Sequence, residues 1–218
     1  MRCRFLALLL LAASAAALAQ SGDVGLVNLV SEGVTFAPLS GSPGETKPFM
    51  RVRNGDRFNV PAGGQIRIIY FASSRQERWS GPANFRAGNG ASEAISGKPA
   101  EIAVLPADVP QRIARVPELI QGAKLGGIQV RGELTRRKQA SLDQQTTVRE
   151  AHDTYERMRK EMPADDITPE LFLYSALYDY LLYDDMKTVV DEMLRRQPGS
   201  EDAQTLATFV REQLARRK

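Results

Sequence analysis

The stretch RVRNGDRFNVPAGGQIRIIYF, from Arg51 to Phe71, contains three glycines, a proline and a run of β-branched and aromatic residues. A phosphate-binding loop would need converging backbone amides, a lysine that reaches the anion, and a helix behind the glycines. Here Gly63 and Gly64 lead instead into residues 65–71, whose composition predicts a strand. We therefore expect the glycines in turns, where glycine adopts a positive φ without steric cost.

Short extended segments continue on both sides of this stretch, from residue 24 to about residue 132, and glycine, proline, serine and asparagine separate them. This pattern is typical of an all-β domain. Candidate strands are residues 24–30, 33–37, 49–53, 65–71, 77–79, 84–86, 93–95, 101–105 and 128–131. In several of them polar and apolar residues alternate, as where Ile66 and Ile68 flank Arg67, which predicts one face in the core and one in solvent.

The hydrophobic period changes from about residue 136, where apolar residues recur at the helical spacing of three or four. A first helix is predicted to end at Pro163, and Thr168 and Ser200 are expected to cap the second and the fourth. A third helix should stop before Pro198. The C-terminal part is therefore predicted to be a bundle of about four helices, and the whole chain to be α+β in two parts.

The second of these helices is apolar nearly all round, since Leu171, Tyr174 and Leu177 occupy one side while Phe172 and Leu173 occupy another. A helix with this pattern is normally buried on more than one side. We therefore expect it at the centre of the helical part, covered by the other helices and by either the β domain or a second copy of the chain.

The chain is predicted to begin with a secretory signal peptide, residues 1–19, because two arginines precede a short apolar run that ends in small residues. A β domain at residues 20–135 and a helical domain at residues 136–218 should follow. Between the last strands, the proline-rich residues 105–127 could hold only a short helix, at about residues 111–121. The mature protein is expected in the periplasm, without an integral membrane span.

The net charge and the composition of the chain exclude some classes of binding partner and cofactor. The precursor has 29 Lys+Arg and 26 Asp+Glu, and loss of Arg2 and Arg4 with the leader leaves 27 against 26, a net charge of +1. A charge this small argues against nucleic acid as a partner. The only cysteine, Cys3, lies in the leader, and the only histidine, His152, has no second nitrogen ligand in a recognisable motif. We expect no cofactor and no metal.

Three segments resemble the FecR domain of bacterial periplasmic sensors and stand-alone exported proteins: LVNLVSEGVTF (26–36), MRVRNGDRFNVPAGGQIRIIYF (50–71) and ERWSGPANFRAG (77–88). The resemblance implies a twisted solenoid or sandwich of short strands that binds protein partners without catalysis. Residues 173–198 are more weakly similar to a tetratricopeptide unit, through apolar residues and Pro198 near the positions of that 34-residue pattern. A plain helical bundle is an equally open alternative.

Aromatic residues supply the candidate binding positions, and no catalytic residue is assigned. Trp79 in the β domain is either a core residue or, with neighbouring Phe85, part of a surface that stacks on a sugar or a partner. The tyrosines of the helical part are predicted to lie in the core first and at an interface second, and they are Tyr174, Tyr178, Tyr180 and Tyr183.

Two functions follow from these observations. The first is a non-enzymatic periplasmic protein-binding or scaffold protein of the cell envelope, which meets an envelope partner or a second copy through its helices. The alternative is a carbohydrate- or peptidoglycan-binding envelope protein that uses Trp79 as a stacking platform, with Glu77 as a possible acid.

Overall fold

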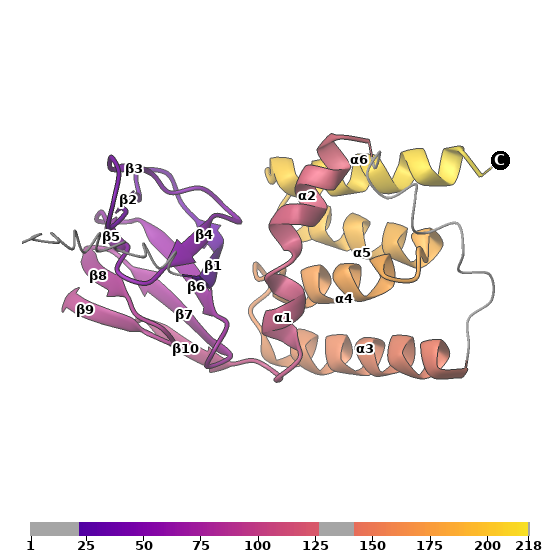
Figure 1. The fold of residues 1–218 in the computed structure, drawn as a ribbon, viewed down its shortest axis with the longest axis horizontal. Coiled ribbons are helices and arrows are strands. Elements are labelled where there is room, and N and C mark those ends of the chain that lie inside the picture. The colour runs from indigo at the N-terminus through magenta and orange to yellow at the C-terminus, as the bar shows by residue number, and fades with distance from the viewer. Residues whose placement is uncertain (1–21, 127–141, 218) are drawn as a thin grey trace, which may run out of the picture.

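A computed structural model describes residues 22–126 and 142–217 (Figure 1). It shows a mixed α+β protein, with antiparallel strands in the N-terminal part and helices in the C-terminal part, which confirms the predicted class. The described strands are β1 (Asp23–Val30), β2 (Thr35–Ala37), β3 (Gly44–Glu45), β4 (Arg51–Arg53), β5 (Arg57–Val60), β6 (Gln65–Tyr70), β7 (Arg75–Ser80), β8 (Ala83–Ala87), β9 (Ser92–Ser96) and β10 (Glu101–Val104). The described helices are α1 (Val109–Ile113), α2 (Val116–Lys124), α3 (Leu142–Glu161), α4 (Thr168–Tyr178), α5 (Tyr183–Arg196) and α6 (Glu201–Ala215).

The strands form two five-stranded sheets. The first, which we call the inner sheet, has the order β10-β7-β6-β1-β4, and the second, the outer sheet, has the order β3-β2-β5-β8-β9. Strands β3 and β5 were not predicted, because β5 carries only two buried apolar residues, Phe58 and Val60, between polar ones. The other described strands lie within a few residues of their predicted positions.

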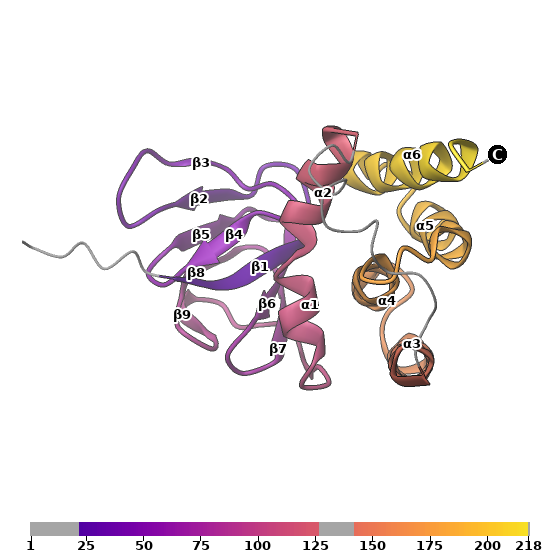
Figure 2. The ribbon, with the colours of Figure 1, turned by 45° about the vertical axis from the view of Figure 1, so that its right-hand side comes forward.

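The central strands of the inner sheet, β1 and β6, have buried residues on both faces. One face packs against the outer sheet in a core that includes Val27, Ile68 and Trp79. The opposite face contributes Leu26 and Ile69 to a second core, which it shares with the helices. The protein therefore has three layers, the outer sheet, the inner sheet and the helices, and Figure 2 shows the helices on one side of the inner sheet.

This arrangement corrects the prediction of a solvent-exposed second face for β6, whereas in β8 of the outer sheet Arg86 is exposed between the buried Phe85 and Ala87, as the alternation predicts. The side chain of Arg67 on β6 is only 1% exposed, although it alternates with the core residues Ile66 and Ile68. Helices cover the face on which it lies, and two aspartates of the segment before α4 form ion pairs with it. Alternation of charged and apolar residues therefore did not distinguish a wet face from a face that buries an ion pair.

Helix α4 lies at the centre of the helical layer, as predicted. All ten residues from Thr168 to Leu177 are buried. Helices α1, α3 and α5 pack against α4, and α2 packs mainly against α6. The proline-rich segment therefore forms two short helices that belong to the helical layer, rather than one helix at about residues 111–121.

The helix caps show one success and one error of prediction. Ser200 caps α6, since its Oγ accepts a hydrogen bond from the backbone N–H of Ala203 at 3.2 Å. Thr168 does not cap α4 but is its first residue, and Asp166 Oδ1 accepts the bond from its N–H at 2.9 Å. The hydroxyl of Thr168 is engaged elsewhere, in contacts with the β sheet described below.

The predicted signal peptide, the predicted strand at residues 128–131 and the start of the predicted helical domain lie outside the described residues. Among the helices that the structure does describe, none is both long and apolar enough to cross a membrane.

Candidate functional site

The aromatic residues predicted for the β domain lie in its core. Trp79 and Phe85 have no exposed surface, and their rings stack with centroids 4.4 Å apart. The indole Nε1 of Trp79 donates a hydrogen bond to Glu77 Oε2 at 3.0 Å, and Glu77 is itself fully buried. A buried ring cannot stack on a sugar, so the structure corrects the assignment of Trp79 and Phe85 as binding residues.

The predicted tyrosines are also largely internal. The ring of Tyr178 lies 6.2 Å from those of Tyr174 and Phe209, and Tyr183 meets Phe209 edge-on. Burial raises the pKa of the Tyr174, Tyr178 and Tyr183 hydroxyls. Tyr180 is partly buried in the turn after α4. Three of the four tyrosines therefore form core contacts that hold α4, α5 and α6 together, consistent with the first of the two roles predicted for them.

The inner sheet and the helical layer meet in a buried polar cluster centred on Asp166, which we call the joint. Asp166 is fully buried in the segment between α3 and α4. Its Oδ1 accepts a hydrogen bond from Asn28 Nδ2 at 3.0 Å, and its Oδ2 accepts one from Gln76 Nε2 at 2.6 Å. Arg67 Nη1 lies 3.6 Å from Oδ2, at ion-pair distance. Strands β1, β6 and β7 thus each contribute one side chain to the same carboxylate.

Thr168 completes the joint. Its hydroxyl lies 2.6 Å from Asp166 Oδ1 and 3.2 Å from Gln76 Oε1, and it accepts a hydrogen bond from Asn28 Nδ2 at 2.7 Å. Both hydrogens of the Asn28 amide are therefore used, one on Asp166 and one on Thr168. Buried polar groups that satisfy one another in this way fix how two layers meet, because any slippage leaves a group unpaired.

A second ionic cluster holds the segment that carries Asp166. Arg159 Nη1 donates to Glu170 Oε2 at 3.0 Å, and Arg196 Nε lies 3.2 Å from Glu170 Oε1. Arg159 also donates to the backbone carbonyls of Asp166 and Pro163. Burial raises the pKa of Glu170 above its usual value of 4.5, against the opposing attraction of the two arginines.

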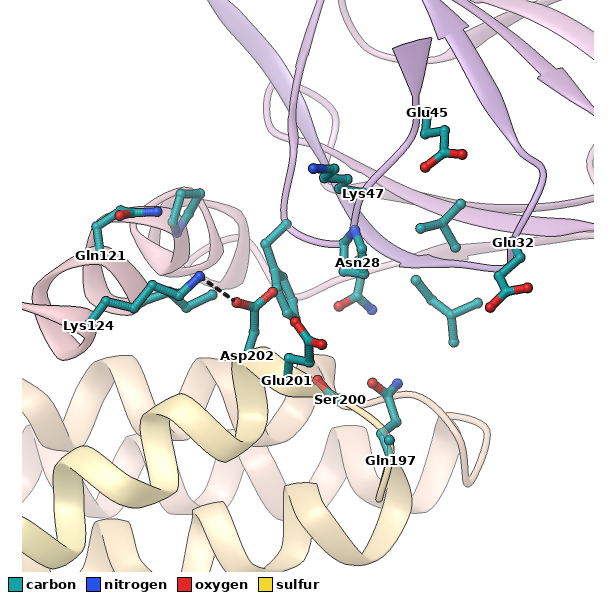
Figure 3. Close-up of a pocket in the computed structure, with 17 residues that line it drawn as sticks. Asn28, Glu32, Glu45, Lys47, Gln121, Lys124, Gln197, Ser200, Glu201 and Asp202 are labelled. Atoms are coloured by element: carbon teal, nitrogen blue, oxygen red, sulfur yellow. Dashed lines mark hydrogen bonds and ion pairs between the residues drawn. The ribbon is translucent and has the colours of Figure 1, made fainter.

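An open cleft of about 920 Å³ lies beside the joint, between the β sheets and the helices (Figure 3). Its walls come from four segments: β1 with the turn after it, the connection from β3 to β4, helix α2, and the turn from α5 to α6. The charged residues that line it are Glu32, Glu45, Lys47, Lys124, Glu201 and Asp202. Volumes of this order are usual for pockets that bind a ligand much larger than a single ion.

Apolar and amide groups also line the cleft. Phe49 is 7% exposed and has a left-handed backbone, with φ of 57°, which is rare for a bulky residue. Its N–H donates to the carbonyl of Val27 at 2.7 Å, which anchors the β3–β4 connection to β1. Asn28 of the joint also lines this cleft, so the joint and the cleft share a residue.

Sequence reasoning did not identify the residues of the joint or the cleft. Acids directly before a helix usually cap it, and this interpretation of Asp165–Asp166 describes the bond from Thr168 N–H but not the contacts with β1 and β7. A usable signal was present at Arg67, a charged residue between Ile66 and Ile68 in a strand rich in isoleucine, because an arginine that is buried requires a partner.

Within residues 22–126 and 142–217, no group of three or more His, Cys, Asp and Glu side chains lies close enough together to hold a metal ion. His152 lies on α3 and is partly buried. Comparison of the chain with protein-family models, with curated protein sequences and with solved structures finds no match.

Proposed function

We propose that the protein is a non-enzymatic binding or scaffold protein of the bacterial cell envelope, exported to the periplasm, and that the cleft between its two parts receives a protein partner. In this proposal the β sheets are a FecR-like domain, and the helices α3 to α6 are an interaction module of the bundle or tetratricopeptide type. The observation that carries the proposal is the cleft, because several of its charged side chains have no partner within the described part of the chain.

The joint supports this function. A scaffold presents a fixed surface, and the buried bonds around Asp166 make the two walls of the cleft parts of one packed body. A preorganised site loses less entropy when it binds than a site that must first be assembled.

Site-specific photo-crosslinking in living cells tests the proposal. A photoreactive residue is placed at the cleft rim, at position 45 or 121, and in matched cells at position 156 on the exposed face of α3. We expect one discrete protein adduct, identified by mass spectrometry, from the rim positions in the periplasmic fraction. Adducts from position 156 alone would show a partner that binds elsewhere, and the absence of any adduct would contradict the proposed function.

A further inference from the structure

The side chains that line the cleft include carboxylates that pair with no hydrogen-bond donor of the described chain. The carboxylates of Glu32, Glu45 and Glu201 form no hydrogen bond or ion pair with the rest of the described chain. They come from three different segments, the turn after β1, strand β3 and the first turn of α6. Figure 3 shows them around one space rather than on one helix face. An unpaired carboxylate in such a space favours a cationic group.

Positive groups in the cleft do not balance these acids. Lys124 donates to Asp202 Oδ1 at 3.2 Å, so that ammonium already has a counter-charge. Lys47 is the other lysine of the lining. The positive end of the α6 helix dipole is offset by Glu201 and Asp202, which lie in the first turn of that helix. Four carboxylates against two ammonium groups leave the lining with a net charge of −2.

Asn28 gives an independent indication of what the cleft binds. The residue is 1% exposed, yet its carbonyl oxygen Oδ1 has no hydrogen-bond partner. The amide cannot turn round to satisfy it, because Oδ1 would then face the carboxylate of Asp166, which only accepts. In Figure 3 the carboxamide of Asn28 points into the space between β1 and the first turn of α6. A buried carbonyl oxygen without a partner favours a ligand that brings an N–H group.

We propose that the cleft binds a basic segment of a partner polypeptide, with an arginine side chain seated among Glu32, Glu45 and Glu201 and an N–H group of the ligand directed at Asn28. This inference rests on the proposed function and names the chemistry of its partner. Arginine fits better than lysine, because its planar guanidinium offers five N–H groups and can bridge two carboxylates. The cleft volume of about 920 Å³ leaves room for neighbouring residues of the same peptide.

Fluorescence anisotropy with three labelled pentapeptides tests the inference on the purified mature chain. The peptides have the sequence Gly-X-Gly-X-Gly, where X is arginine, glutamine or glutamate, and carry the same label. We expect the arginine peptide to bind at least tenfold more tightly than the glutamine peptide, and the glutamate peptide to bind most weakly. The arginine affinity should also fall as salt is raised, because partly exposed charges are screened.

A triple variant and a matched control locate the site. Glu32→Gln, Glu45→Gln and Glu201→Gln together should weaken the arginine peptide about tenfold, since each exposed ion pair contributes about 1.4- to 5-fold. The control combines Glu150→Gln, Glu156→Gln and Glu161→Gln, which remove the same charge from exposed positions on α3, outside the cleft lining, and should leave the affinity unchanged. Thermal unfolding followed by circular dichroism checks that both variants fold.

The results separate this inference from the function on which it rests. Equal binding of the three peptides, tighter binding of the glutamate peptide, or equal losses in the cleft and control variants would overturn the basic-ligand inference. If rim crosslinks persist in that case, the cleft still receives a protein, but of different chemistry. If the arginine peptide binds and no crosslink forms in cells, the ligand class stands and the scaffold function does not.

Discussion

The substitution Asp166→Asn tests whether the joint couples the β sheets to the helices. Asparagine keeps the shape of the side chain but replaces one acceptor oxygen by an NH₂ group. In the wild type, Gln76 Nε2 donates a hydrogen bond to Asp166 Oδ2 at 2.6 Å. If the new NH₂ group takes the place of Oδ2, two donors face each other at this position. Rotation of the Gln76 amide could restore a hydrogen bond there, but nothing restores the negative charge 3.6 Å from the buried guanidinium of Arg67.

The loss of the Asp166 charge determines how much the unfolding free energy falls. Removal of one partner of a buried ion pair costs about 3–5 kcal/mol, and hydrogen bonds to charged groups contribute about 1.5–3 kcal/mol each. Arg67 keeps a second aspartate, Asp165, whose Oδ2 lies 3.4 Å from Nη2. We therefore expect a loss of about 3 kcal/mol in the free energy of unfolding, at the low end of the range for a buried pair.

Urea unfolding with two probes measures this effect. Fluorescence of Trp79, the only tryptophan, reports on the core between the two sheets, and ellipticity at 222 nm reports on the helices. Both transitions should move together to lower urea, because the inner sheet belongs to both cores. Asp165→Asn is the control, and since that side chain is 51% exposed it should cost less than about 1 kcal/mol. A loss below about 1 kcal/mol for Asp166→Asn, or an unchanged Trp79 transition, would refute the coupling.

Four further outcomes are expected. Trp79→Ala should lower the unfolding free energy by about 3–5 kcal/mol in urea, because it leaves a cavity in the core, and should leave peptide binding unchanged once the protein is folded. Burial raises the pKa of Glu170 in the folded state, so ionisation of this carboxyl opposes folding. The unfolding free energy of the wild type relative to Glu170→Gln, measured in urea at pH 4 and pH 7, should therefore fall as pH rises above about 4.5. A higher relative unfolding free energy at pH 7 than at pH 4 would contradict the raised pKa. Gly25→Ala should lower the melting temperature, because a Cβ there would lie 2.4 Å from the carbonyl oxygen of Ile69. By contrast, Gly122→Ala in α2 meets nothing within 4 Å and should gain about 0.5–1 kcal/mol.

Local patterns were sufficient to predict most elements of the fold, although not β3, β5 or the two short helices α1 and α2. Strand β6 follows from its β-branched and aromatic run, and the start of α6 follows from Ser200 and the acids after it. The position of α4 at the centre of the helical layer follows from apolar residues all round the helix. Each of these predictions uses residues that are neighbours along the chain, and therefore needs no knowledge of how distant segments meet.

The joint could not be predicted in the same way. Asn28 and Asp166 are 138 positions apart, and Gln76 and Asp166 are 90 apart, so no spacing rule connects them. Each residue also has a common local interpretation, as a strand asparagine, a strand glutamine and a helix-capping acid. The cleft is harder still, because its charged residues come from four segments and only the docking of the layers brings them together.

Asn28 belongs to both the joint and the cleft. These two features distinguish the molecule from a β domain and a helical bundle that are joined only by a linker. Its Nδ2 group holds Asp166 and Thr168 in the joint, while the residue also lines the cleft and its buried Oδ1 has no hydrogen-bond partner. A donor placed against Oδ1 polarises the amide and strengthens the hydrogen bonds that Nδ2 donates, since hydrogen bonds in a chain reinforce one another in a low-dielectric site. A ligand in the cleft would therefore contact both walls and also tighten the bonds that hold those walls together.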